Sequence, residues 1–165
     1  MVVLFISSSC FKLPAEFQFG ELNEQHAEQM VRDRNFGCPE LNLLFYRYIL
    51  KHYPSSAIFQ QRSTRPVAYI TYRPEGCLGL GYTDPAHRGY GFFKMLICQM
   101  LVKLRKLGLT QTYGYAAADN YPSIKGMLAA GGVIIDNYQP DFIEFIPKDW
   151  LVDKCLQRYQ PTLKL

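Results

Sequence analysis

Residues 77–108 read CLGLGYTDPAHRGYGFFKMLICQMLVKLRKLG, and this stretch decides the fold. Its first seven residues are typical of a strand, and the sequence DPxHRGxG then leads into a helix. Apolar residues from Phe93 to Leu107 recur every three or four positions, and Gly108 follows as a C-terminal cap. The next strand-like segment, 110–117, begins after a one-residue link. The whole segment therefore predicts a βαβ unit with two adjacent parallel strands.

Alternating and helical patterns surround this unit. Period-two alternation predicts strands over 17–22, 55–60 and 66–72, and the short connections join the last two to 77–83 as an antiparallel meander. Caps and three-to-four spacing predict a helix after Asn23, another from Pro39 to the residues before Pro54, and a short one over 121–130. The segments 133–138 and 142–146 are expected to close the sheet as a hairpin.

Composition narrows the class of protein. The chain has 165 residues, 48% hydrophobic and 19% charged, which suits one folded domain and not a disordered tail. We expect that domain over 17–150, after an N-terminal extension or first strand at 1–16 and before a C-terminal tail at 151–165. No apolar run approaches the ~20 residues of a membrane helix, so no membrane partner is expected.

Charge and cysteine content argue against several kinds of site. The net charge of +4 comes without a cluster of Lys and Arg, so nucleic-acid binding is not expected. Three isolated His and five Cys without a CxxC pair form no metal set. That cysteine pattern fits free thiols in a reducing compartment, and we expect an intracellular protein, cytoplasmic or mitochondrial.

The start of the long helix is a candidate phosphate site. The first N–H groups of a helix lack partners inside the helix and carry its positive dipole end. Gly89 and Gly91 allow close approach of a ligand to this backbone, and Arg88 adds a permanent positive charge. The sequence is neither a Walker loop nor a Rossmann fingerprint. The alternative is a plain turn without a ligand.

Two resemblances follow from these residues. The run Arg88–Phe93 resembles the R-x-x-G-x-G/A signature of the GNAT superfamily of acyl-CoA-dependent N-acyltransferases, and the order of elements is similar. A closer resemblance, over roughly 20–150, is to the C-terminal half of the glycine N-acyltransferase family. That resemblance rests on Leu22, His26-Ala27, Asn35-Phe36-Gly37, Tyr53-Pro54-Ser55, Pro66-Val67, Gly81-Tyr82-Thr83, Pro85, Arg88, Gly91, Gln99, Leu107-Gly108, Asn120 and Ser123.

The resemblance implies an α/β (α+β) fold: a mixed, strongly twisted sheet with helices on both faces. It also implies that 77–83 and 110–117 diverge as a V that admits the pantetheine arm of acyl-CoA. The implied reaction moves an acyl group to the amino group of a small acceptor such as glycine or another amino acid, with no metal. The implied cofactor-binding residues are Leu80, Tyr82, Thr83, Arg88, Gly89, Tyr90, Gly91, Phe92, Phe93, Asn120 and Ser123.

The catalytic positions depart from the family pattern. The Glu regarded as the general base in these enzymes aligns with Cys77, and Glu75 is a candidate substitute on the same strand face. Glu75 is otherwise an exposed turn residue, Cys77 is either a nucleophile or a small buried apolar residue, and a water chain needs neither side chain. A Tyr that many GNAT enzymes carry aligns with Met127, so Ser123 or Tyr115 is left to supply a hydroxyl.

These departures leave a second function open, a GNAT-fold module that binds acyl-CoA without turnover. The family enzymes are also about twice as long, with a further half before the matching one. We expect that what that half contributes is absent unless a second copy of the chain, in a homodimer, supplies it.

Overall fold

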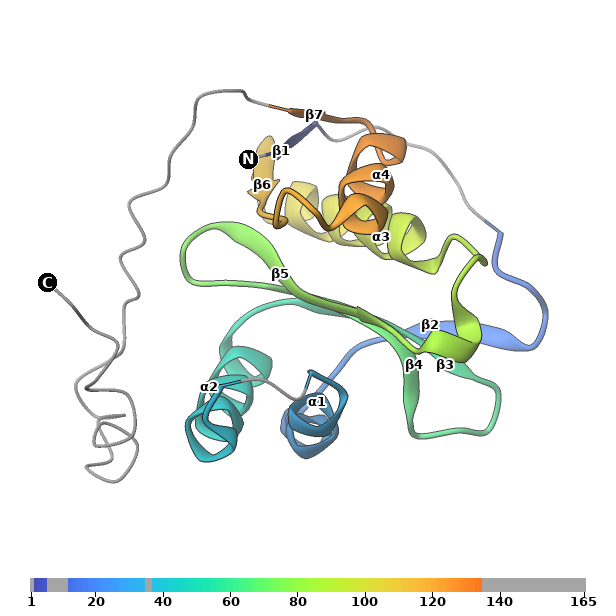
Figure 1. Ribbon diagram of the computed structural model, residues 1–165, viewed down its shortest axis with the longest axis vertical. Coiled ribbons are helices and arrows are strands. Elements are labelled where there is room, and N and C mark those ends of the chain that lie inside the picture. Colours follow the sequence, from blue (N-terminus) through green and yellow to red (C-terminus); the bar gives the residue numbers. More distant parts are fainter. Residues whose placement is uncertain (1, 6–11, 35–36, 135–165) are drawn as a thin grey trace, which may run out of the picture.

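A computed structural model describes residues 2–5, 12–34 and 37–134. In this part of the chain seven strands form one sheet, in the order β2-β3-β4-β5-β6-β1-β7 (Figure 1). Neighbouring strands are antiparallel except β5 and β6, which are parallel, as expected. The strands are β1 (Val2–Phe5), β2 (Phe17–Gly20), β3 (Ser55–Gln60), β4 (Pro66–Tyr72), β5 (Cys77–Thr83), β6 (Gln111–Gly114) and β7 (Gly132–Ile134).

Helices cover both faces of the sheet. The α-helices are α1 (Ala27–Arg34), α2 (Pro39–His52), α3 (Phe92–Lys106) and α4 (Tyr121–Ala129), with short 3₁₀ helices η1 (Glu24–His26) and η2 (Pro85–His87). Figure 1 shows α1 and α2 below the sheet and α3 and α4 above it. The fold class expected from the sequence is therefore confirmed.

Each face of the sheet has its own apolar core. On one face α3 buries Leu96, Ile97, Met100, Leu101 and Leu104, which are the three-to-four repeat seen in the sequence. On the other face α1 and α2 pack Met30, Tyr46 and Ile49 against β3 and β4, and Tyr69 of β4 belongs to this second core. β3 and β4 are buried along nearly their whole length, because their successive side chains point alternately into the two cores.

Local sequence signals set where η1 and α2 begin. The Asn23 side chain accepts a hydrogen bond from the Gln25 N–H, and the His26 ring nitrogen Nδ1 accepts one from the Asn23 N–H at 3.0 Å. Pro39 is the first residue of α2. These local signals need no tertiary context because they satisfy the orphan N–H groups of the first turn.

Strand predictions were right in the meander and too long elsewhere. Segments 55–60, 66–72 and 77–83 are β3, β4 and β5, and this meander is antiparallel. The expected strand 110–117 was wrong beyond Gly114, where pairing with both β5 and β1 stops. The expected strand 17–22 ends at Gly20, and beyond it the Leu22 N–H bonds the side-chain hydroxyl of Ser55 in β3 at 2.9 Å instead of a backbone carbonyl.

The first and last strands of the described residues, β1 and β7, are neighbours in the sheet. β1, at the start of the chain, pairs antiparallel with β6 on one side and β7 on the other. The sequence left a first strand open but did not place it between these two. β7 matches the beginning of the expected strand 133–138. The remainder of that strand, the partner strand 142–146 and the expected tail 151–165 lie outside the described residues.

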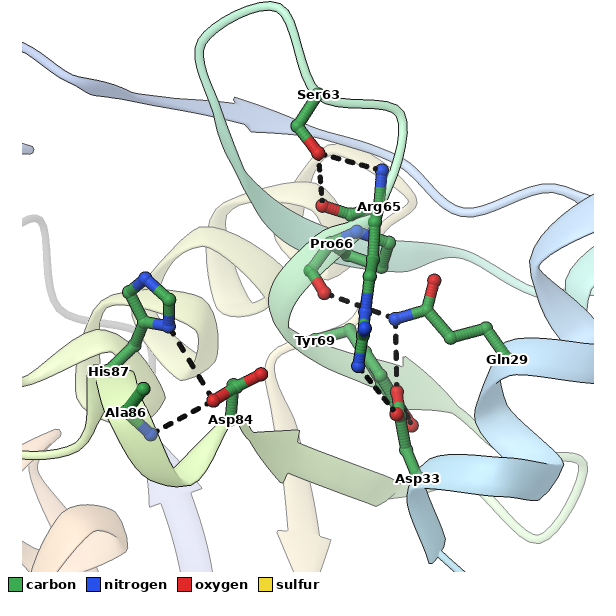
Figure 2. Close-up of polar contacts among 9 residues, drawn as sticks. All are labelled: Gln29, Asp33, Ser63, Arg65, Pro66, Tyr69, Asp84, Ala86 and His87. Atoms are coloured by element: carbon green, nitrogen blue, oxygen red, sulfur yellow. Dashed lines mark hydrogen bonds and ion pairs between the residues drawn. The ribbon is translucent and has the colours of Figure 1, made fainter.

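A buried carboxylate ties α1 to β4. The Asp33 side chain, 4% exposed, accepts hydrogen bonds from Tyr69 at 3.4 Å and from Gln29 at 3.2 Å and pairs with Arg65 at 3.5 Å (Figure 2). Gln29 also donates to the Pro66 carbonyl at 3.3 Å. Burial and the Asp33 charge both raise the pKa of Tyr69, so its hydroxyl stays a donor. These contacts set the position of the last turn of α1.

Candidate functional site: the gap between β5 and β6

The two parallel strands separate soon after they meet. Only Cys77–Tyr113 and Leu78–Gly114 are paired, while β5 continues to Thr83. Parallel neighbours that part in mid-sheet leave one side of β5 without a strand partner, and the peptide groups there can bond a ligand. The divergence expected for these strands is therefore confirmed.

A β-bulge marks the point of separation. Against β4, Thr71 pairs with Gly79 and Tyr69 pairs with Tyr82, so β5 carries one extra residue between them. Leu80, inside this bulge, has φ of 53°, a left-handed value that is uncommon outside glycine. The Thr71 hydroxyl donates to the Gly79 carbonyl at 3.2 Å. Bulges bend a strand and are frequent beside active sites, and this one bends β5 where β6 ends.

A cavity of about 150 Å³ occupies the gap. It reaches both faces of the sheet, since Phe93 and Met127 line it from α3 and α4 and Arg34 lines it from α1. The full lining is Arg34, Ile70, Leu78, Gly79, Leu80, Gly81, Phe93, Ile97, Tyr115, Asn120, Ser123 and Met127. Of the residues expected at the site, the cavity gathers Leu80, Phe93, Asn120 and Ser123, and it leaves out Glu75, Cys77, Tyr82, Thr83, Arg88, Gly89, Tyr90, Gly91 and Phe92.

Glycines set the width of the gap on the α3–α4 face. A Cβ at Gly81 would lie 2.7 Å from the Phe93 ring, and one at Gly126 would lie 2.5 Å from the same ring. The ring of Phe93 therefore fills the space between β5 and α4. On β6 a Cβ at Gly114 would lie 3.1 Å from the Met127 sulfur. Larger residues at these glycines would close the cavity.

The start of α3 lies open beside the gap. Gly91 is the N-terminal cap with φ of 76°, and Gly89 has φ of 88°. A Cβ at either position would meet no heavy atom within 4 Å beyond the neighbouring residues in the chain, so the space beside both glycines is open. The α-helical bond from the Met95 N–H to the Gly91 carbonyl, at 3.1 Å, leaves the N–H groups before it directed out of the helix.

The loop before α3 is held by its own contacts. The Asp84 carboxylate accepts the Ala86 N–H at 2.9 Å and lies 3.7 Å from His87 Nδ1 (Figure 2). Phe17 of β2 packs edge-on against His87, at a centroid distance of 5.7 Å, and against Phe92 at 4.8 Å. The loop is thus tied to the sheet on one side and leaves the backbone at Gly89 and Gly91 open on the other.

The other end of β5 carries the candidate catalytic side chains, and neither lines the cavity. The Glu75 carboxylate pairs with Arg73 at 2.6 Å in the turn before β5. Cys77 is 2% exposed, and burial raises the pKa of its thiol to about 11. A thiol with that pKa is protonated at neutral pH, and the thiolate is the reactive form of cysteine.

Two residues that carry a hydroxyl, Ser123 and Tyr115, do line the cavity. Ser123 lies in the first turn of α4, where its N–H bonds the Asn120 side chain at 3.3 Å. Tyr115 follows β6 and is 39% exposed, with its ring edge-on to Tyr113. Both could give a proton to a leaving group in the gap. Tyr113 itself donates to the Glu75 carbonyl and joins β6 to the turn before β5.

Sequence reasoning missed Arg34 as a lining residue. It is one of two basic residues in the last turn of α1, the other being Arg32, and nothing in the spacing distinguishes them. Only the packing of α1 on the sheet brings Arg34 to the gap. The described residues include no cluster of three or more His, Cys, Asp or Glu suited to a metal ion. In the same part of the chain, every helix is too short or too polar to cross a bilayer.

Known proteins resemble this chain in structure and not in sequence. No family model matches the chain, and no curated protein matches it. A solved Drosophila protein superposes with a TM-score of 0.68 at 16% identity over 80% of this chain. This chain spans 47% of that protein, or about half its length.

Two solved acetyltransferases superpose over most of their own length. A predicted acetyltransferase from Clostridium acetobutylicum, solved with acetyl-CoA, gives a TM-score of 0.61 at 10% identity over 75% of this chain and 94% of its own. The aminoglycoside antibiotic 6′-N-acetyltransferase from Acinetobacter baumannii gives 0.60 at 17% identity over 79% and 99%. The chain therefore has the fold of the GNAT N-acetyltransferases. Likeness at this identity shows the fold alone, so membership of the GNAT superfamily and the glycine N-acyltransferase resemblance both stay predictions.

Proposed function

We propose that the chain is an acyl-CoA-dependent N-acyltransferase that moves an acyl group to the amino group of a small acceptor, glycine or another amino acid. The observation that carries this proposal is the gap between β5 and β6, together with the glycine-capped start of α3, where the space beside Gly89 and Gly91 is open. A thioester on a long diphosphate-bearing arm needs both features: a cradle for the diphosphate and a slot for the arm.

Each end of the donor has a partner in this arrangement. The diphosphate binds the N–H groups of Arg88 to Phe93, where the helix dipole and the Arg88 charge favour an anion. The pantetheine arm runs along the open side of β5 from Leu80 to Thr83, with Tyr82 on that stretch. The thioester then lies in the cavity among Phe93, Asn120 and Ser123.

The reaction needs an amine, a fixed acyl group and a leaving thiol. The amine lone pair attacks the thioester carbonyl, the C–S bond breaks, and the products are an amide and free CoA thiol. Ser123 or Tyr115 gives the departing sulfur its proton, and water or Glu75 takes the proton of the amine. Cys77 is proposed only as a buried apolar residue in this scheme, because its raised pKa keeps the thiol protonated.

A second function has its own support. Cys77 and Met127 occupy the positions where the resembled enzymes carry their base and acid, and both are apolar and buried here. A module that holds acyl-CoA without turnover would keep the gap and the helix start and lose those two groups. The protein would then act as a regulator or as a partner domain.

One assay separates the two functions. The protein is incubated with acetyl-CoA or benzoyl-CoA and a panel of amino acids, and release of free thiol is followed. Release that requires an acceptor supports the enzyme, and a fall with Glu75→Gln assigns the base. Thermal stabilisation by CoA without release supports the module, because a ligand that binds only the native state raises its stability. A protein that shows neither thermal stabilisation by CoA nor release of thiol would refute both functions.

A further inference from the structure

Arg34 brings a positive charge into the gap. It is the last residue of α1, and its side chain lines the cavity from the face opposite α3 and α4. Among the described residues of the lining it is the only one that carries a formal charge. A cation is an unexpected neighbour for an amine, because in water at neutral pH a primary amine is itself a cation.

The guanidinium is held at the gap by neighbouring groups. Arg34 Nη1 donates to the Gly81 carbonyl at 2.9 Å, at the end of the bulge in β5. The buried Tyr46 hydroxyl of α2 bonds the same side chain, and the Arg34 charge acts to lower the Tyr46 pKa against the larger effect of burial. The preceding residue, Asp33, is bound to Gln29, Tyr69 and Arg65 (Figure 2), so the turn that carries Arg34 is fixed.

We propose that Arg34 binds the carboxylate of the acceptor, so that the protein acylates amines that carry a carboxylate close to the amino group. A guanidinium is a planar set of donors that matches a carboxylate in two parallel hydrogen bonds. This inference rests on the proposed function and adds to it a specificity-determining residue and a charge requirement. Polyamines and other amines without a carboxylate are then poor acceptors.

The charge balance of the gap follows from this assignment. Among its described residues the cavity lining has no carboxylate, so an acceptor with an amino group alone would bring a second positive charge beside Arg34. An amino acid brings its own counter-charge. Arg34 also disfavours the protonated form of the nearby amine, and this favours the neutral nucleophile that attacks the thioester. The displaced proton goes to water.

The test compares two acceptors that differ in one charge, glycine and glycinamide. The quantity measured is kcat/KM for glycine divided by kcat/KM for glycinamide, with one acyl-CoA donor. From wild type to Arg34→Gln, we expect this ratio to fall by about 10- to 100-fold, the usual effect of a charge-assisted hydrogen bond. Arg32→Gln removes an exposed cation from the same turn and should leave the ratio unchanged. An equal fall for both acceptors in Arg34→Gln would overturn the proposal.

A binding measurement separates this inference from the proposed function. With CoA present, N-acetylglycine should bind wild type more tightly than N-acetylglycinamide does, and Arg34→Gln should remove the difference. If that holds while no amine releases thiol, Arg34 binds carboxylates and the transferase function is wrong. If transfer occurs and Arg34→Gln changes neither ratio nor binding, the transferase stands and the role of Arg34 is wrong. Unchanged CoA stabilisation in the variant verifies that it folds.

Discussion

The two ends of β5 differ in the groups that form the candidate site, which are peptide groups at one end and side chains at the other. At its C-terminal end, where the chain passes to α3, the candidate site is made of peptide groups: the bulge at Leu80 and the helix start at Gly91. At its N-terminal end the site depends on side chains, and there the resembled pattern is broken at Cys77. A backbone site tolerates sequence change wherever glycine and the helix start are kept, whereas a catalytic side chain has no such substitute.

The largest expected effect is at the backbone site. Gly91→Val places a β-branched residue at φ of 76°, which costs about 1–3 kcal/mol of stability, and puts a side chain where the ligand would approach. We expect the affinity for CoA to fall by about tenfold or more, equivalent to ~1.4 kcal/mol, in a calorimetric titration. The control is Gly108→Val, with φ of 85° at the far end of α3.

Gly108→Val should destabilise the protein to a similar degree and leave CoA affinity unchanged. If both variants lose affinity for CoA to the same degree, backbone strain explains the loss, and blocked access of the ligand to the helix start does not. The backbone site would then be no different from any other glycine turn.

The second prediction concerns the wall of the gap. In a helix, Gly→Ala ordinarily stabilises by roughly 1 kcal/mol. At Gly126 the new Cβ would lie 2.5 Å from the Phe93 ring, so we expect Gly126→Ala to destabilise the protein, by about 1–3 kcal/mol in urea unfolding. Adding Phe93→Leu should recover much of the loss. A stabilised single variant would show that the gap is wider than the packing indicates.

A third prediction uses the buried thiol at the other end of β5. Burial raises the pKa of Cys77 to about 11, against an ordinary value of 9.0. Between these two pH values the folded state holds a proton that the unfolded state releases, so the contribution of Cys77 to the free energy of unfolding is constant below pH 9.0 and falls as the pH rises towards 11. Unfolding in urea between pH 8 and pH 11 measures this slope.

Cys77→Ala should flatten that slope from its lower edge. The same thiol should resist alkylation by iodoacetamide in the native protein. Rapid alkylation of Cys77 at neutral pH would instead restore it as a candidate nucleophile.

The smallest expected effect is on the stability of Glu75→Gln. The Glu75–Arg73 pair is 35% and 29% exposed, and pairs near solvent contribute about 0–1 kcal/mol. We expect a loss of stability within that range, comparable to that of Glu28→Gln in the exposed pair with Arg47. A loss of acyl transfer in Glu75→Gln would then reflect chemistry and not misfolding. A large loss of stability would make Glu75 a structural residue.

Local signals in the sequence predicted more of the fold than of the site. The caps at Asn23 and Pro39, the alternation in 55–83 and the apolar repeat of α3 each act within one element, so the sequence reveals them. The extent of β6 was predicted wrongly, because a strand ends where its neighbours leave and those neighbours are far away in the chain. The place of β1 between β6 and β7 has the same cause.

The sequence alone determined the βαβ unit and the open start of its helix, because periodicity and glycine act over a few residues. The tertiary structure alone decided which side chains face the gap. It brought Arg34 there from a helix on the opposite face and kept Glu75 and Cys77 out of the lining. Side chains from distant segments meet only through packing, and packing is a property of the folded chain rather than of any single stretch of sequence.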